Sequence, residues 1–385
     1  MKDLYQRILK NSVNNKKQLI AVYNRYLESH ENITIKGKIR AYSFLSKLFF
    51  LDVIKSPRLY NYPSYNPYKY YIECEHLGDK NPDKVLYIVK RDESGEGFIA
   101  IIRTILYAMV FADKFHLDPV ITISKRSKYF QNGGWNGILN PFEYFFKQPS
   151  GVSIKEALHS DKVVKFKPHH LEIVKDYPLT NPYYHDDDFT SFLAYYYKKY
   201  IVLNDETRLK IQHDIDSLLG NEKALGIHFR GGDYAKNYDR HPKMVYIEDY
   251  YECIDEAIDK FGYTKIFAAT DDIKALEKLK DRYKEKVVSY SDVLRTDDDE
   301  SVMNKESDRD NNQFLLGYEV LRDMYTLAAC DSIISGISMV NIIARVAKKA
   351  SGEEYIYDKY IDKGINDNLN NYDSVIYKER KNNMR

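Results

Sequence analysis

The chain has 385 residues, and its formal charge is +1 because 58 lysine and arginine residues nearly balance 57 aspartate and glutamate residues. At about 150 residues per domain, this length predicts two or three domains. The balanced charge excludes a general attraction to nucleic acid or to an anionic membrane, and the content of 44% hydrophobic and 30% charged residues is typical of a globular protein rather than a disordered one.

The first half of the chain predicts a helical lead-in and loop followed by a strand, helix and strand. Apolar residues with helical spacing occupy the first 57 residues, and a stretch rich in Tyr, Pro and Asn follows. The next predicted elements are a strand at 85–89, a turn at Gly95–Gly97, a helix at 99–115, a strand at 119–123, loops over 125–190 and a helix at 195–220.

The second half alternates apolar strands with helices. The strands are predicted at 224–229, 265–269, 286–290 and 332–335, and the helices at 247–261, 273–283, 314–329 and 339–349. This alternation predicts an open, mainly parallel sheet with helices on both faces. We expect four consecutive parts: a lead-in and loop at 1–75, α/β domains at 76–215 and 216–350, and a tail at 351–385 that is at most partly ordered beyond Ile361.

The cysteines and the apolar segments indicate where the protein resides. Cys74, Cys253 and Cys330 lie far apart without a C-x-x-C motif, so they predict neither disulfides nor a zinc knuckle. Residues 1–19 lack the apolar core of a signal peptide, and the most apolar window, 98–112, is too short to cross a bilayer. We expect no transmembrane segment and a location in the cytoplasm or, through peripheral association, at the inner face of the membrane.

Polar residues follow three of the strands predicted in the second half, where ligands of parallel sheets bind. These residues are His228, Arg230 and Asp233 after the first strand, Asp271 and Asp272 after the second, and Ser338 after the last. His228 and Arg230 are two residues apart on an extended segment, so they project to one side, and the planar donors of arginine suit a phosphate. A plain ion pair between Arg230 and Asp233 beside a glycine turn explains the same pattern, and both interpretations stay open.

Five segments resemble motifs of one enzyme family. His228–Asp233 resembles the H-x-R-x-x-D motif of the fucosyltransferase superfamily, which includes α1,6-, α1,2- and protein O-fucosyltransferases. Ala269–Asp272 is similar to the A-T-D-D segment of the α1,6 branch, and Val320–Asp331 is similar to the family's aspartate-bearing helix. Ser335–Ser338 resembles the T-x-S-S segment, and Gly95–Phe98 resembles the glycine loop before the first long helix.

This resemblance spans residues 84–124 and about 200–350 in the family's order, and it implies a fold and a reaction. The fold is α/β of the GT-B type, with two facing Rossmann-like domains that contain parallel sheets. The reaction is an inverting transfer of fucose from GDP-fucose, without a metal or other cofactor. The acceptor is a hydroxyl of a glycan, such as a bacterial surface polysaccharide or lipopolysaccharide, and the first 200 residues supply its contacts.

The resemblance also assigns roles to single residues. Carried over by position, Arg230 holds the β-phosphate of the donor, and His228 and Asp323 contact its nucleoside. The remaining residues assigned to the donor site are Asp271, Asp272, Ser338, Gly95 and Gly97.

Two departures from the family pattern leave the proton acceptor open. Many relatives have a second arginine where Gly231 stands here. The family acid lies about ten residues beyond the histidine, whereas Asp239 lies eleven beyond His228. An inverting transfer needs a group that takes the acceptor's proton, and Asp233 and Asp239 are both candidates.

Other interpretations compete with this one. The acidic runs 186–188 and 297–299 offer ligands to a metal-dependent glycosyltransferase, but neither follows an apolar strand, and both predict solvated loops. The same fold also suits a transferase with a different nucleotide sugar, or a protein that binds a nucleotide or sugar without catalysis. Tyrosine clusters such as 195–197 predict half-buried packing or contact with a sugar.

Overall fold

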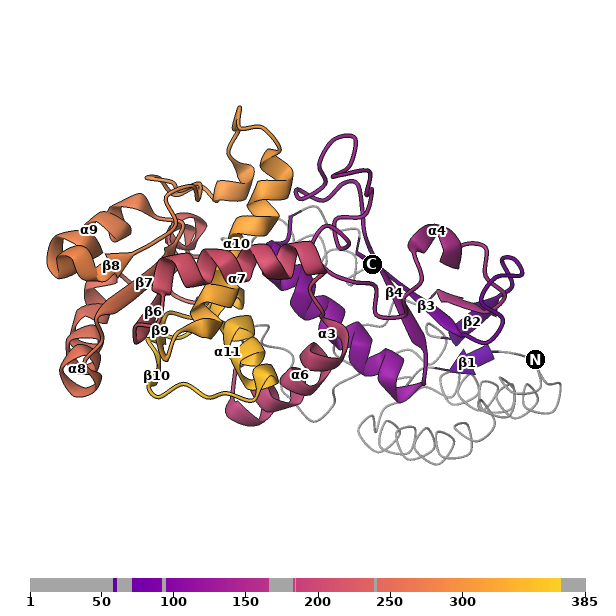
Figure 1. The fold of residues 1–385 in the computed structure, drawn as a ribbon, viewed down its shortest axis with the longest axis horizontal. Coiled ribbons are helices and arrows are strands. Elements are labelled where there is room, and N and C mark those ends of the chain that lie inside the picture. The colour runs from indigo at the N-terminus through magenta and orange to yellow at the C-terminus, as the bar shows by residue number, and fades with distance from the viewer. Residues whose placement is uncertain are drawn as a thin grey trace, which may run out of the picture. The chain divides into compact units, whose positions relative to one another are not determined.

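The computed structural model describes residues 58–60, 71–91, 95–165, 183, 185–238 and 241–367, and Figure 1 shows their course. The helical lead-in, the last residues of the tail and Asp239 lie outside the described residues. By its contacts the chain divides into two compact units. The first unit comprises residues 1–90, 107–122 and 148–179, and the second comprises residues 91–106, 123–147 and 180–385. These units are groups of contacts, and the four consecutive parts expected from the sequence stay a prediction.

The first sheet contains five strands in the order β1–β2–β5–β3–β4. The strands are β1 (Arg58–Tyr60), β2 (Tyr71–Glu75), β3 (Leu86–Arg91), β4 (Asp118–Ile123) and β5 (Val163–Lys165). β3 and β5 are parallel, whereas β2 pairs antiparallel with both β1 and β5, so this sheet is mixed. The loop expected around 56–71 was wrong at its ends, which are strands, and the loops expected over 125–190 contain β5 and the short helix α4 (Ile154–Ala157).

Helix α3 (Phe98–Lys114) agrees with the predicted helix within one residue at each end. Its side chains are apolar on nearly all sides, which is typical of a buried helix. Its first backbone N–H, that of Phe98, donates to the Tyr129 hydroxyl at 2.8 Å, so a side chain satisfies one of the N–H groups that a helix start leaves unpaired.

The second sheet is parallel throughout and has the order β10–β9–β6–β7–β8. Its strands are β6 (Ala224–Phe229), β7 (Lys265–Thr270), β8 (Val287–Val288), β9 (Ser332–Ser335) and β10 (Asp358–Tyr360). The chain builds β6, β7 and β8 toward one side and then adds β9 and β10 on the other, so the strand order reverses between β6 and β9. β10 was not predicted from the sequence, and β8 is shorter than the strand predicted at 286–290.

Six helices accompany the second sheet: α6 (Asp187–Tyr200), α7 (Asp205–Leu219), α8 (Tyr251–Phe261), α9 (Ile273–Tyr283), α10 (Asn312–Ala329) and α11 (Met339–Ser351). The single helix predicted at 195–220 was wrong, because the chain breaks between α6 and α7. The side chain of Asn204 causes the new start by accepting a hydrogen bond from the backbone N–H of Thr207 at 2.8 Å.

The alternation of side chains along β6 divides its two faces. Leu225, Ile227 and Phe229 belong to one apolar cluster with residues of α8 and α9. The other face approaches α10, where a Cβ added at Gly226 would lie 3.1 Å from the Leu327 side chain. Together the two sheets and their helices confirm the α/β class that the GT-B architecture implies. Within the described residues, no helix combines the length and the apolar character that crossing a membrane requires.

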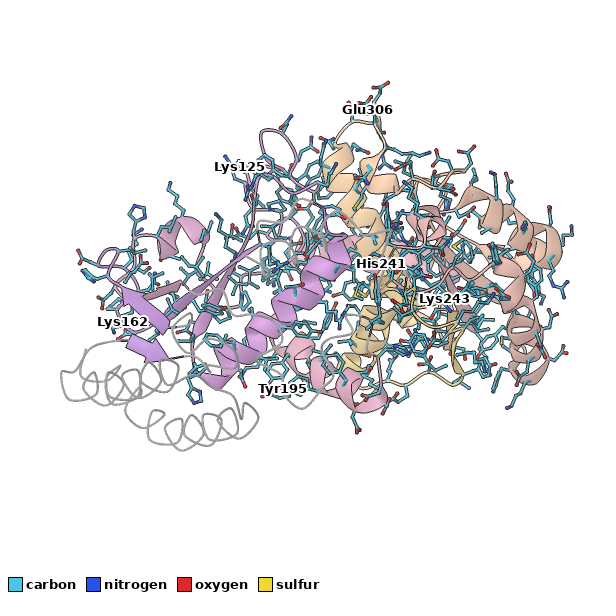
Figure 2. All side chains as sticks on the ribbon, turned by 180° about the vertical axis from the view of Figure 1, so that it is seen from behind. Lys125, Lys162, Tyr195, His241, Lys243 and Glu306 are labelled. Atoms are coloured by element: carbon cyan, nitrogen blue, oxygen red, sulfur yellow. The ribbon has the colours of Figure 1, made fainter. Side chains whose placement is uncertain are left out.

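The tyrosines of α6 serve mainly in packing. Tyr197 is buried, and its hydroxyl donates to that of Tyr325 on α10 at 2.7 Å. Tyr195, on the opposite side of the helix, is 58% exposed, and Figure 2 shows it at the surface. The cluster is therefore half-buried, as one of the two interpretations predicts.

Candidate functional site

Arg230 lies where β6 ends, at the carboxyl edge of the second sheet, by which we mean the C-terminal ends of β6, β7 and β9 with the residues that follow them. Its Nη1 contacts a carboxylate oxygen of Asp271, which directly follows β7. Its Nη2 lies 2.5 Å from Oδ1 of Asp233, in the 3₁₀ turn at Gly232–Lys236. Asp271 also accepts a hydrogen bond from the Gly231 N–H at 2.9 Å. Two carboxylates, one in the turn after β6 and one directly after β7, therefore hold one guanidinium in place.

The sequence left two interpretations of Arg230 open, an anion-binding residue and a partner of Asp233 in an ion pair, and the arrangement has a counterpart for each. The ion pair between Arg230 and Asp233 exists, and the Arg230 side chain is still 27% exposed. A guanidinium has more N–H donors than two contacts use, so an arginine held in this way can still donate to an anion. Gly231 also has a packing role, because a Cβ there would lie 2.6 Å from the Cβ of Asp272.

His228 is a buried, neutral histidine at the same edge. In the sheet it lies between Ala269 of β7 and Ser335 of β9. Burial, reinforced by the positive charges of Arg230 and Arg345, lowers the pKa of His228 to about 3. Its Nδ1 lies 3.1 Å from the amide nitrogen of Asn341. Because an amide N–H only donates, Nδ1 accepts, and the proton of the neutral ring resides on Nε2, which is a donor.

Polar contacts from β9 and α11 support His228. The same amide nitrogen of Asn341 lies 2.9 Å from the carbonyl oxygen of Gly336 and 3.2 Å from the hydroxyl oxygen of Ser338. The Tyr250 hydroxyl accepts from the Gly336 N–H at 2.7 Å and donates to the His228 carbonyl at 3.1 Å. The sequence analysis did not single out Asn341 or Tyr250, because an isolated amide or phenol has no motif that would reveal it.

Asp323 is a buried carboxyl on α10, one helical turn before Leu327. Leu327 of the same helix faces Gly226, and α10 leads to the start of β9, so it runs opposite to the strands. Burial raises the pKa of Asp323 to about 7, although Arg322 and Arg295 oppose that rise.

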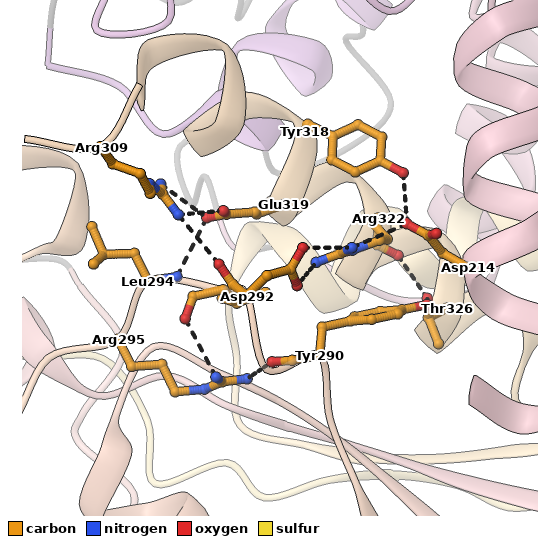
Figure 3. A network of polar contacts seen from close by, with 11 residues as sticks. Asp214, Tyr290, Asp292, Leu294, Arg295, Arg309, Tyr318, Glu319, Arg322 and Thr326 are labelled. Atoms are coloured by element: carbon orange, nitrogen blue, oxygen red, sulfur yellow. Dashed lines mark hydrogen bonds and ion pairs between the residues drawn. The ribbon is translucent and has the colours of Figure 1, made fainter. Parts of the chain in front are cut away.

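Arg322, the residue before Asp323 on α10, belongs to an ionic network that Figure 3 shows. The guanidinium of Arg322 lies 3.0 Å from Asp214 on α7 and 2.5 Å from Asp292, and it covers the ring of Tyr290 at 3.8 Å. Arg295 donates to the carbonyl of Tyr290 at 3.0 Å. These contacts join α7, α10 and the segment after β8. The sequence offered no signal for them, because the partners are distant in the chain.

Asp272 and Ser338 lie at helix starts beside the carboxyl edge. Oδ1 of Asp272 accepts from the backbone N–H of Ala275 at 3.0 Å and caps α9. Ser338 directly precedes α11, and its contact with Asn341 connects it to His228. Both residues thus have structural partners, and their roles toward a donor stay predictions.

The glycine loop is close to Arg230 through Tyr129. Gly95 and Gly97 precede α3, whose first N–H binds the Tyr129 hydroxyl. Burial raises the pKa of Tyr129 to about 12, and the positive charge of Arg230 is near enough to oppose this rise. A Cβ added at Gly97 would meet nothing within 4 Å, so packing does not require a glycine there.

The two acidic runs have structural partners. Asp186 caps α6 by accepting from the Phe189 N–H at 2.7 Å, and Asp187 pairs with Lys349 at 2.9 Å, so the loop expected at 186–188 was wrong. In the second run, Asp298 pairs with Lys305 at 2.8 Å. Over the part of the chain that the structure describes, no group of three or more His, Cys, Asp or Glu residues is arranged to hold a metal ion. The reaction without a metal stays a prediction.

Comparisons with known proteins identify similar structures but no sequence relatives. No family model and no curated protein matches this chain. Among solved structures, the NodZ α-1,6-fucosyltransferase co-crystallized with GDP has a TM-score of 0.40 and 16% identity, over 69% of this chain and 92% of that one. Fucosyltransferase NodZ from Bradyrhizobium also has a TM-score of 0.40 and 16% identity, over 69% and 93%. POFUT1 in complex with GDP-fucose has a TM-score of 0.44 and 12% identity, over 73% and 99%.

Proposed function

We propose that this chain is an inverting glycosyltransferase that transfers fucose from GDP-fucose to a hydroxyl of a glycan acceptor, such as a bacterial surface polysaccharide or lipopolysaccharide. The observation that carries the proposal is the position of Arg230, which two carboxylates orient at the carboxyl edge of a parallel sheet. That edge lies beside the point where the strand order reverses, between β6 and β9. Open α/β sheets bind their ligands at such a point.

The chemistry of the leaving group supports a role for Arg230. When the bond between fucose and GDP breaks, negative charge accumulates on the β-phosphate. A guanidinium that is already oriented stabilises this charge without reorganisation, and such an interaction strengthens toward the transition state. Asp233 is the more exposed of its two partners, at 23% against 13% for Asp271. We therefore expect Asp233 to yield its contact when a phosphate binds, while Asp271 keeps the guanidinium in place.

Two buried polar groups, His228 beside Arg230 and Asp323 on α10, are complementary to guanine. Guanine presents the acceptors N7 and O6, and its N2 amine is a donor. The Nε2–H of His228 can donate to an acceptor, and the carboxylate of Asp323 can accept from the amine. A buried polar group that is left unpaired costs binding free energy, and guanine can pair with both of these groups, so the pair suits a guanine nucleotide.

A thermal-shift experiment with GDP, GDP-fucose, GDP-mannose, UDP and UDP-glucose tests the donor. A ligand that binds only the native state raises the melting temperature. We expect GDP and GDP-fucose to stabilise the protein and UDP to have no effect. No response to GDP together with a response to UDP contradicts the guanine site. GDP-fucose binding without release of GDP in the presence of glycan acceptors identifies a binding protein instead of an enzyme. We expect the enzyme's turnover to survive EDTA.

A further inference from the structure

Asn341, on the first turn of α11, is fully buried and contacts both His228 and Arg345. Its amide nitrogen lies 3.1 Å from Nδ1 of His228, and its amide oxygen lies 3.4 Å from Nη1 of Arg345. A guanidinium only donates, so it faces the amide oxygen, and the carbonyl of Gly336, which only accepts, lies 2.9 Å from the amide nitrogen. These two neighbours determine that the nitrogen of the amide, and not its oxygen, faces the histidine.

Arg345 is itself held by several partners. Its Nε and Nη2 lie 2.9 Å and 2.6 Å from Oδ1 of Asp358 on β10, and its guanidinium covers the ring of Tyr360 at 3.7 Å. Its Nη1 also donates to the hydroxyl of Ser335 at 3.1 Å. A buried arginine with an ion pair, a stacked ring and a hydroxyl acceptor has little freedom to rotate. The orientation of the Asn341 amide is therefore built into the fold and does not depend on a bound nucleotide.

The residue at position 341 decides which nitrogen of His228 bears the proton. The ring is neutral, because burial and the charges of Arg230 and Arg345 lower its pKa to about 3. A proton on Nδ1 would face the N–H of the amide at 3.1 Å, so the proton resides on Nε2. A carboxylate in place of the amide would accept from Nδ1–H and leave Nε2 as an acceptor. The direction of the hydrogen bond that Nε2 offers is thus set by the amide.

We infer that Asn341 determines the base specificity of the candidate donor site, because it makes His228 a hydrogen-bond donor that selects a base with an acceptor at that place. The inference rests on the proposed function, in which Nε2–H donates to guanine. Guanine presents the acceptors N7 and O6, whereas adenine presents its N6 amine, a donor, in the place of O6. Arg345 and Asp358 are positioning residues, since they act through the amide of Asn341.

The position of the proton can be measured on the full chain without any nucleotide. NMR of the ring nitrogens distinguishes the protonated nitrogen of a neutral imidazole from the unprotonated one, and the spectrum of His228→Gln identifies the signals of His228. We expect the proton on Nε2 in the wild type and on Nδ1 in Asn341→Asp. A wild-type proton on Nδ1 overturns the inference, whatever the protein binds.

Titration with three nucleotides tests the selection of the base. The probes are GDP, a deazaguanosine diphosphate with carbon in place of N7, and an aminopurine riboside diphosphate without O6. A buried group that loses its partner weakens binding by about 10-fold or more, so the wild type should bind one of the two analogues that much less tightly than GDP. Asn341→Asp should bind GDP as weakly as the wild type binds that analogue, and its affinity for the analogue itself should hardly change.

Asn312→Asp is the matched control. Asn312 is also a buried amide whose oxygen accepts from an arginine, Arg309, at 3.1 Å, and it lies on the first turn of α10. The same exchange of amide for carboxylate at this position should leave the affinities for all three nucleotides at their wild-type values. A loss of GDP affinity in Asn312→Asp equal to that in Asn341→Asp overturns the inference, because a general effect of a buried carboxylate then explains both.

The remaining outcomes separate the inference from the proposed function. Unchanged GDP affinity in Asn341→Asp overturns the inference alone, as do equal losses of affinity for GDP and both analogues, which indicate a structural role. If Asn341→Asp does not fold, the wild type still decides: a proton on Nε2 together with weaker binding of one analogue supports the inference, and the absence of either overturns it. A wild type that binds neither GDP nor GDP-fucose overturns the proposed function, and the selection of the base with it.

Discussion

Replacement of Arg230 by alanine separates its role in stability from its role in binding. The change leaves Asp271 and Asp233, whose side chains are only 13% and 23% exposed, without their shared counter-charge. Exposed ion pairs contribute about 0.2–1 kcal/mol, whereas breaking a fully buried pair costs about 3–5 kcal/mol. At intermediate exposure we expect a loss of about 1–2 kcal/mol in the free energy of unfolding, or roughly 2–8 °C in melting temperature.

The same substitution should weaken GDP binding by more than its effect on folding explains. A hydrogen bond to a charged group contributes about 1.5–3 kcal/mol, so the Kd for GDP should rise by about 10- to 150-fold. Calorimetric titration at a temperature where both proteins are folded measures this change. Arg230→Lys keeps the charge but loses the planar donors that contact both carboxylates. Its affinity for GDP should lie between that of wild type and that of Arg230→Ala.

Arg282→Ala provides the matched control. Arg282 forms an ion pair of the same kind, 2.6 Å from Asp255, and covers the ring of Tyr251 at 4.6 Å, but it lies at the C-terminal end of α9. Its loss should lower the melting temperature slightly and leave GDP binding unchanged. Equal GDP affinities of wild type and Arg230→Ala, together with a lower melting temperature of the variant, would refute the reasoning and leave Arg230 as a structural ion-pair partner.

Three further predictions concern the carboxylates. Burial raises the pKa of Asp323 to about 7 from an ordinary 3.8. As pH rises between these two values, the Asp323 carboxyl loses its proton in the unfolded chain but keeps it in the folded protein, so the free energy of unfolding falls. The free energy of unfolding of Asp323→Asn should therefore rise relative to that of wild type between about pH 4 and 7, by up to about 4 kcal/mol. A difference in melting temperature between the two proteins that does not change with pH would contradict this. Asp272→Ala should lose about 1 kcal/mol with the cap of α9 and Asp272→Ser should recover it; a serine variant as unstable as the alanine variant argues against a cap. Asp233→Asn should bind GDP more tightly than wild type in titration, whereas weaker binding would mean that Asp233 does not compete with phosphate.

The periodicity of the sequence predicted the second sheet well because its strands and helices are local patterns. β9 (Ser332–Ser335) and α9 (Ile273–Tyr283) match the predictions residue for residue, and polar residues after three strands indicated the carboxyl edge. Parallel strands end at the same edge, so local elements were enough to predict that His228, Arg230 and Asp271 would meet. The network that orders these residues was not predicted, since the contacts of Arg322 with Asp214 and Asp292 join residues 108 and 30 positions apart.

Errors in the first half have a different physical cause. β1, β2 and β5 are three to five residues long, and β2 pairs with β5 far along the chain, at Cys74 and Val164. Such short strands have no periodicity of their own that could distinguish them from loops, and only tertiary pairing makes them strands. The break between α6 and α7 was missed for a similar reason, because helical spacing continues through it while a single side chain, Asn204, starts the second helix.

The charges at the carboxyl edge explain why one group cannot serve both as brace and as base. Without a ligand, Asp233 and Asp271 together place more negative than positive charge around Arg230, and a diphosphate adds to that excess. The excess of negative charge falls if the Asp233 carboxylate withdraws from the Arg230 guanidinium. In its new position that carboxylate still lies next to the negatively charged phosphate. A neutral acceptor of the proton avoids this repulsion, because it becomes positive when the leaving group becomes negative.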